Sequence, residues 1–227
     1  MLKADLHIHV KGDKQDNIRY TAHQLIDRAS ELKYEVLAIT CHDVVLYSEE
    51  LAAYAASKWI LLIPGAEKTL NGKHVLLYNL TNEELDAIGT FDDLRELKKK
   101  KKILVIAPHP YFLTPFCLGK ELEKNIDLFD ALEYSHYHTT FINFNRKAVK
   151  LAKKYHKPIV GNSDTHDLLR CTTTYSLIDS AKNTEAVIST VKSGNVQCVS
   201  SPLPLKDFMR ITCWIFISFL KKIILRP

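Results

Sequence analysis

The stretch "DLHIHV", residues 5–10, places two histidines one residue apart in an apolar run near the start of the sequence. Alternate residues of a β-strand point to the same face, so His7 and His9 would share a face on which a buried strand normally carries Val, Ile or Leu. Taken alone, they are two polar residues at positions where a core is expected. Their role therefore depends on what the rest of the chain places beside them.

The composition is that of one soluble globular domain. The chain has 227 residues, of which 46% are hydrophobic and 25% charged, and its net charge of +5 permits a polyanionic partner without requiring one. The five cysteines form no CxxC pair, and the N-terminus lacks the long apolar run of a signal peptide. We therefore expect a reducing, cytoplasmic location.

Short apolar runs of strand length alternate with segments of helical periodicity. The expected strands are residues 4–8, 36–39, 60–63, 74–78, 103–107, 131–134, 158–160 and 196–199. Thr81 with Glu84, and Thr90 with Asp93, have the spacing of helix capping boxes. This alternation predicts an α/β fold in which helices cover a parallel sheet, either closed into a barrel or open.

Two segments invite other interpretations. The five lysines at 98–102 could contact nucleic acid, but they end a helix, where cations are favoured, so we expect a solvated helix end. The apolar stretch 211–225 is interrupted by Lys221 and Lys222, and its unbroken part is about half the ~20 residues needed to span a bilayer. We expect a C-terminal helix over 208–227 that packs on the core, on a partner subunit of a homo-oligomer, or on a membrane surface.

Possible metal ligands follow six of the expected strands. They are His7 and His9; His42 and Asp43; Glu67; His109; His136 and His138; and Asp164 with His166. Because the carboxyl ends of parallel strands meet on one face of a barrel, these groups should converge in one pocket. Imidazole and carboxylate suit Zn²⁺, Mn²⁺ and Fe²⁺, and so many ligands exceed the needs of one ion. The other histidines, His23, His74 and His156, are not expected to be ligands.

Five short motifs, in order, resemble those of the polymerase-and-histidinol-phosphatase (PHP) superfamily of metal-dependent phosphoesterases. They are "HIH" at the first strand, "TCHD" after the second, "GAE" after the third, "APHP" after a middle strand and "GNSDTH" near the end. The resemblance implies that residues 1–207 form a distorted (β/α)7 TIM-like barrel. It also implies two or three divalent ions, Zn²⁺, Mn²⁺ or Fe²⁺, at the face where the strands end.

The resemblance also implies which residues hold these ions. One ion would be held by His7, His9, Glu67 and Asp164, and Glu67 would bridge to a second ion held by His109 and a histidine after "ALEY", for which we favour His136 over His138. The third would be held by His42, His166 and an acidic residue, for which we favour Asp16 over the nearby Asp13. The family commonly has Asp where this chain has Cys41, and Asp43 could take over the task of orienting His42.

The implied activity is hydrolysis of a phosphate ester, monoester or diester, by a metal-activated water. His166 and Asp43 are the candidate catalytic residues, and Arg146, His138, Arg170 and Lys68 are candidates to contact the substrate phosphate. The substrate would be a small phosphate ester or a nucleic-acid end. Two alternatives remain at this point: a metal hydrolase that resembles the amidohydrolases, and a PHP domain that binds metal without catalysis.

Overall fold

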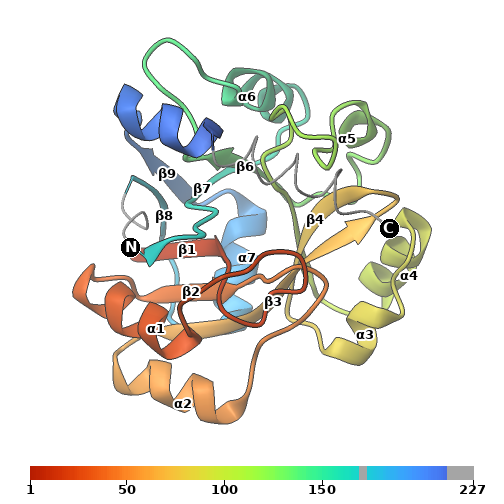
Figure 1. Ribbon diagram of the computed structural model, residues 1–227. Coiled ribbons are helices and arrows are strands. Elements are labelled where there is room, and N and C mark those ends of the chain that lie inside the picture. Colours follow the sequence, from red (N-terminus) through yellow and green to blue (C-terminus); the bar gives the residue numbers. More distant parts are fainter. Residues whose placement is uncertain (169–172, 214–227) are drawn as a thin grey trace, which may run out of the picture.

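The strands of the protein form one sheet that winds almost into a barrel in the computed structural model, which describes residues 1–168 and 173–213 (Figure 1). In chain order the strands are β1 (Leu2–Ile8), β2 (Val36–Ile39), β3 (Leu61–Leu70), β4 (Lys73–Tyr78), β5 (Leu104–Ala107), β6 (Ala131–Ser135), β7 (Ile159–Asn162), β8 (Thr174–Ile178) and β9 (Val196–Ser200). Their order in the sheet is β7-β6-β5-β4-β3-β2-β1-β8-β9. The expected α/β barrel-like fold is confirmed, and every strand predicted from the sequence is present.

The helices lie outside the sheet (Figure 1). They are α1 (Ala22–Glu31), α2 (Glu49–Ser57), α3 (Asn82–Asp86), α4 (Phe91–Lys100), α5 (Lys120–Lys124), α6 (Asn145–Lys154) and α7 (Thr184–Ser193). Both predicted capping boxes are confirmed: Thr81 starts α3 with Glu84, and Thr90 starts α4 with Asp93. Residues 205–213 form a further helical segment.

The direction of β4 corrects the expectation of a parallel sheet. Strands β1, β2, β3, β5, β6 and β7 run the same way, but β4 is antiparallel to both β3 and β5. The cause is the tight turn at Asn71 and Gly72, whose φ angles are 49° and 73° and which joins β3 directly to β4. The sequence reading also missed β8, which pairs antiparallel with both β1 and β9.

The two ends of the sheet meet where the end strand β7 approaches β8 and the other end strand, β9. The Gly161 amide donates to Ser176 Oγ at 2.9 Å, and that hydroxyl donates back to the Gly161 carbonyl at 3.0 Å. A Cβ at Gly161 would lie 2.7 Å from the Tyr175 carbonyl oxygen and 2.8 Å from Cys198 Sγ. Only glycine fits this close approach, so the "GNSD" motif begins with a residue that helps to close the barrel.

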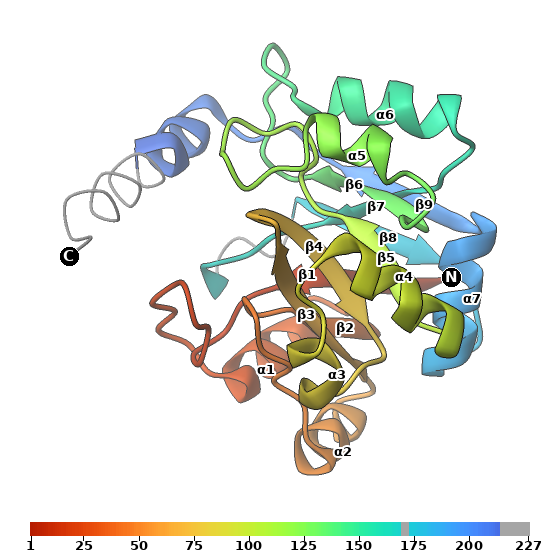
Figure 2. The same cartoon turned by 90° about the vertical axis from the view of Figure 1, so that its right-hand side faces the viewer.

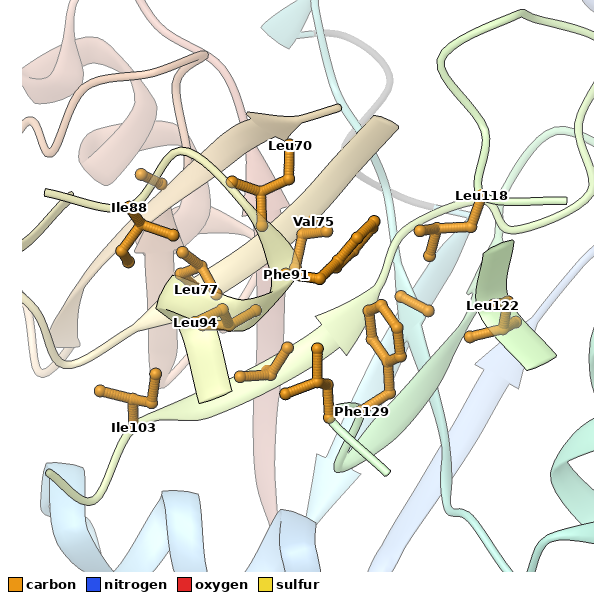
Figure 3. Packing of buried hydrophobic residues seen from close by; sticks show 14 of the residues in the cluster. Leu70, Val75, Leu77, Ile88, Phe91, Leu94, Ile103, Leu118, Leu122 and Phe129 are labelled. Carbon is orange, nitrogen blue, oxygen red and sulfur yellow. The ribbon is translucent and has the colours of Figure 1, made fainter. Parts of the chain in front are cut away.

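The largest apolar cluster fixes the hairpin of β3 and β4 against the α4–β5–α5 region (Figure 3). Phe91 and Leu94 of α4 are buried with Val75 and Leu77 of β4. Each such side chain contributes about 1.5–3 kcal/mol when it leaves water. This packing holds the reversed strand in place and, with it, the residue at its start, His74.

The lysine run ends α4 as expected. Lys98 pairs with Asp130 at 2.9 Å, Lys99 with Glu96 at 2.7 Å and Lys101 with Glu84 at 2.7 Å. Acidic side chains therefore already neutralise three of the five lysines, which does not favour a nucleic-acid surface there.

The C-terminal helical segment begins at residue 205, three residues before the expected start. Phe208 and Ile211 are buried with Tyr137 and Leu203, so this part of the segment packs on the domain itself. The rest of the expected helix, residues 214–227, lies outside the described residues, as does Arg170. No helix in the described ranges is long and apolar enough to cross a membrane.

Candidate metal centre

Glu67 of β3 is the centre of the site, because its buried carboxylate is surrounded by five imidazoles. Its Oε2 lies 3.2 Å from His42 Nε2, 3.3 Å from His7 Nε2 and 3.4 Å from His9 Nε2. Its Oε1 lies 2.9 Å from His74 Nδ1 and 3.1 Å from His109 Nε2. The two oxygens therefore face two different groups of nitrogen ligands.

Backbone pairing explains why His42 reaches Glu67. The segment after β2 continues alongside β3, where the Glu67 amide donates to the Cys41 carbonyl at 3.2 Å and the Asp43 amide donates to the Glu67 carbonyl at 2.9 Å. His42 and Glu67 are thus direct neighbours on adjacent chains. The "TCHD" and "GAE" motifs meet because their strands are parallel and in register.

His7 is oriented by Glu133, a residue that sequence reasoning missed. His7 Nδ1 lies 2.9 Å from Glu133 Oε1, which leaves Nε2 facing Glu67 and, at 3.3 Å, Asp164 Oδ1. The other oxygen of Glu133 accepts the backbone N–H of His109 at 2.7 Å, and Asn162 donates to Oε1 at 2.9 Å. A carboxylate behind a ligand histidine fixes its tautomer and ring orientation, as in many metal sites.

Asp13 contacts the Nδ1 atoms of His9 and His42, as Glu133 contacts that of His7. Its carboxylate lies 2.8 Å from His9 Nδ1 and 3.0 Å from His42 Nδ1, and it accepts the His42 backbone N–H at 2.9 Å. Asp13 therefore orients His42, the task that we expected of Asp43. Although burial raises the pKa of Asp13, hydrogen bonds from His42 and His9 hold it far below its usual value.

Asp16 lies on the other side of this loop. Its Oδ2 is 3.2 Å from His166 Nε2 and 3.8 Å from His42 Nδ1. Asp13, with His9 and His42, forms one of the groups of clustered ligand atoms, whereas Asp16 is in none of the groups found among the described residues. The choice of Asp16 as the acidic ligand of a third ion therefore stays a prediction.

Asp164 and His166 follow β7 and face the first-strand histidines. Asp164 Oδ1 is 3.3 Å from both His7 Nε2 and His9 Nε2. The backbone of Asp164 has a φ of 45° and that of His109 a φ of 27°, in the left-handed region that non-glycine residues rarely occupy. Strain of this kind persists where the surrounding structure enforces it, and it gathers at functional sites.

His74 enters the site although we did not count it as a ligand. It is the second residue of β4, and because β4 runs backwards its start lies at the face where the parallel strands end. Nδ1 of this buried histidine is 2.9 Å from Glu67 Oε1. The signal that could have revealed it is Asn71-Gly72, a dipeptide typical of two-residue hairpin turns. The other two histidines set aside, His23 and His156, are exposed.

Four candidates from the sequence have other neighbours. Asp43 accepts hydrogen bonds from the Thr69 amide at 2.9 Å and from Gln15 Nε2 at 3.2 Å, and Lys68 Nζ lies 3.7 Å from it. His138 Nε2 is 2.9 Å from Ser200 Oγ, and Arg146 is exposed on the first turn of α6. None of these contacts is with the clustered histidines, so a catalytic or phosphate-binding role for these residues stays a prediction.

His136 also stays a prediction. It is buried just after β6, but among the described residues it is in none of the groups whose ligand atoms lie within 4.8 Å of one another. Those groups are His7, His109 and Asp164; His7, His9 and Glu67; His9, Asp13 and His42; His9, Asp164 and His166; and His42, Glu67 and His74.

The electrostatics are those of a cation site. Burial alone would raise the pKa of Glu67, but His74, His7 and His42 hold it well below its usual value. Burial would lower the pKa of His7, but Asp164, Glu133 and Glu67 raise it well above the ordinary value. Each group thus favours its charged form because of the others, and bound divalent ions would replace the protons on the imidazoles.

The donor set fits Zn²⁺, Mn²⁺ or Fe²⁺, since every clustered atom is an imidazole nitrogen or a carboxylate oxygen. Cys41 is not part of it: burial raises the pKa of this thiol to about 12, and its Sγ contacts the backbone of Val10. A protonated thiol is a poor ligand, and Cys41 is in none of the groups of clustered ligand atoms among the described residues.

A family model described as PHP-associated matches residues 143–196, whereas no curated protein matches the chain significantly. Among solved structures, a two-domain protein from Bacteroides vulgatus that contains a predicted PHP-like metal-dependent phosphoesterase has a TM-score of 0.68 at 17% identity, over 92% of this chain and 68% of that chain. PsfC from Pseudomonas syringae has a TM-score of 0.67 at 15% identity, over 99% of both chains.

Endonuclease Q, solved with a 27-mer duplex substrate that has an abasic lesion at its active site, has a TM-score of 0.59 at 16% identity, over 85% of this chain and 56% of that chain. At sequence identities this low, the structural similarity establishes a shared fold. The fold that the five motifs imply is thereby confirmed.

Proposed function

We propose that this protein is a metal-dependent hydrolase of phosphate esters. The observation that carries the proposal is the buried carboxylate of Glu67, whose two oxygens face two separate sets of imidazole nitrogens. A carboxylate in this position can bridge two cations, and paired cations are a common means by which enzymes hydrolyse phosphate esters. The PHP-like fold supports the same class of chemistry.

The clustered side chains divide into three sets of ligands. The first is His7, His9, Glu67 and Asp164, and the second is Glu67, His74 and His109, with His136 as a further candidate. The third, His42, Asp16 and His166, follows from the PHP resemblance; Asp16 Oδ2 lies 3.2 Å from His166 Nε2 and 3.8 Å from His42 Nδ1. Asp13 and Glu133 hold the Nδ1 atoms of three of these histidines, so that each Nε2 faces the centre. The number and the identity of the ions are part of the proposal.

Divalent ions bound at such a centre supply electrostatic stabilisation of a phosphoryl group and lower the pKa of water toward ~7. The side chains of the protein supply the fixed charge and the proton donor. Glu67 and Asp164 stay ionised because histidines surround them, which fixes negative charge where cations are needed. His166 lies at the partly exposed edge of the cluster, between Asp164 and Asp16. When it is not bound to an ion, it is placed to give a proton to a leaving oxygen.

The substrate is a small phosphate ester or a nucleic-acid end. The fold similarity to Endonuclease Q, which was solved with duplex DNA, supports testing nucleic acid beside small esters. We also propose a cytoplasmic location, because the cysteines in the described ranges, Cys41, Cys117, Cys198 and Cys213, are free.

The test is a phosphate-release screen on protein loaded with Mn²⁺ or Zn²⁺. The substrates are nitrophenyl phosphate monoesters and diesters, cyclic nucleotides and short oligonucleotides, with cyclic amides as the amidohydrolase comparison. We expect hydrolysis of at least one phosphate ester, lost in Glu67→Gln and kept in the exposed-site control His23→Ala. Hydrolysis of amides alone, or metal binding with no hydrolysis at all, would overturn the proposal.

A further inference from the structure

The large apolar side chains that are exposed in the described ranges gather at one end of the barrel. Five of the eight are Leu113, Phe141, Ile142, Leu205 and Met209, with exposures of 77%, 89%, 42%, 67% and 52%. We call these five residues the apolar rim. They belong to three segments: the loop after β5, the loop after β6, and the helical residues 205–213.

A buried aromatic cluster fastens the three segments to one another. Tyr137 stacks on Phe208 with ring centroids 4.4 Å apart, and Phe112 lies edge-on to Tyr137 at 4.9 Å and to Phe144 at 5.5 Å. The Leu203 amide also donates to the His138 carbonyl at 2.8 Å. Tyr137 and Phe208 are buried and Phe112 and Phe144 are partly buried, whereas neighbouring apolar residues lie in water. Gathered exposed apolar residues of this kind mark an interaction surface.

The apolar rim lies on the side of the barrel that carries the metal centre. Two of its segments start directly from candidate ligands, because His109 opens the loop after β5 and His136 opens the loop after β6. Figure 2 shows the helical residues up to 213 on the side of the molecule toward which β1 runs. A surface that met the rim would therefore face the site.

The charge of the same segments is strongly positive. In the described ranges, residues 109–120, 139–147 and 203–213 contain Asp207 as their one acidic residue. Their basic residues are Lys120, Arg146, Lys147, Lys206 and Arg210, which gives these stretches a net charge of +4. Most of the net charge of +5 of the whole chain is therefore matched by these stretches.

We infer that the apolar rim docks on an anionic lipid surface and turns the metal centre toward it. A lipid bilayer with anionic headgroups offers both partners that the segments need: an apolar layer for isolated Leu, Ile, Met and Phe side chains, and negative charge for the basic residues. The sequence of residues 214–227, WIFISFLKKIILRP, continues the same combination of aromatic, aliphatic and basic residues with no acidic one.

Two other partners fit less well. A second copy of the chain that met this face through a two-fold axis would bring like charges together, which costs free energy. Nucleic acid would satisfy the basic residues, but its phosphates offer nothing to the aliphatic side chains of Leu113, Ile142 and Leu205.

The experiment is flotation of the full chain with phosphatidylcholine vesicles that do or do not contain phosphatidylglycerol. We expect binding to the anionic vesicles, weakened by added salt because the basic residues contribute. The double variant Leu113→Ser with Phe141→Ser should bind at least about ten-fold more weakly, since two large side chains no longer leave water. The matched control Trp59→Ser with Val149→Ser changes exposed apolar residues outside these segments and should bind like wild type.

The readout needs no enzymatic activity, so it is independent of the proposed function. Wild-type protein that fails to bind anionic vesicles would overturn the inference, as would a rim variant that binds as well as wild type. Sedimentation equilibrium measures whether a second copy of the chain binds instead. A dimer that the rim variant abolishes, with no vesicle binding, would assign the rim to a second copy and contradict docking on lipid.

Discussion

Glu67 and His74 face each other across one hairpin, with His74 Nδ1 2.9 Å from Glu67 Oε1. The two residues are seven positions apart, and the turn at Asn71-Gly72 folds β4 back along β3 so that His74 pairs with Thr69. The hairpin thus supplies Glu67 Oε1 with a second nitrogen partner beside His109, which follows β5.

This relationship predicts that His74 holds an ion. Replacing it in His74→Ala should lower the metal content by about one ion per chain, because the set around Glu67 Oε1 then keeps His109 as its remaining imidazole. The check is elemental analysis of dialysed protein, with the exposed His23→Ala as the control. A His74→Ala protein with the full wild-type metal content would assign the histidine to the core alone.

Glu133 is predicted to act through His7. Glu133→Gln keeps the size of the side chain but cannot accept the hydrogen bonds of His7, Asn162 and the His109 amide together. Loss of such a partner typically weakens metal affinity 10–100-fold. Competition with a chelator measures the affinity, and Glu123→Gln, on the exposed side of α5, is the control. Equal affinities for the Glu133 variant and wild type would contradict the orienting role.

The stability of the metal-free protein should depend on pH in two directions. His7 and His109 have pKa values raised above 6.5, so the stability that they contribute is present below pH 6.5 and is lost as the pH rises through their folded values. Glu67 and Asp164 have pKa values lowered from 4.5 and 3.8, so their contribution is present above those values and lost as the pH falls. The metal-free protein should therefore be most stable in mildly acidic solution.

Bound ions should offset the loss of stability at higher pH, because metal competes with protons for the same imidazoles and binds more tightly as they lose their protons. The difference in Tm between metal-loaded and chelated protein should grow between about pH 6 and pH 8. Thermal unfolding across this range, with and without a chelator, gives the result. A difference that is constant or that shrinks as the pH rises would be inconsistent with histidine ligation.

Closure of the barrel predicts an effect at Gly161. Gly161→Ala would place a methyl group 2.7 Å from a backbone oxygen of β8, so we expect a loss of about 1–3 kcal/mol in the free energy of unfolding. Gly89→Ala is the control, because its added carbon would lie 3.7 Å from its nearest neighbour, an ordinary contact. Urea unfolding of both variants measures the difference, and equal stabilities would mean that β7 and β8 do not meet as described.

Much of this arrangement could be predicted from the sequence, because parallel strands place their carboxyl ends on one face whatever their exact order. His7, His9, His42, Glu67, His109, Asp164 and His166 were identified in this way, and the structure brings all of them together. The pattern of apolar runs does not show in which direction a strand runs. His74 was therefore set aside although its strand was predicted.

Glu133 and Asp13 were harder to place for different reasons. Glu133 lies inside the strand "ALEYS", where we looked for ligands only after the strand, yet a fully buried carboxylate in an apolar strand is itself a signal. Asp13 and Asp16 lie three residues apart in an irregular loop, and only its folded path shows that Asp13 contacts His9 and His42.

The central claim is that the protein hydrolyses phosphate esters with the help of divalent ions, which Glu67 would bridge. The most direct test measures metal content and phosphate release together, on wild type and Glu67→Gln. We predict at least two divalent ions per wild-type chain with measurable phosphate release, and a loss of both ions and activity in the variant. Fewer than two ions per wild-type chain, or a Glu67→Gln protein that keeps full activity, would contradict the account.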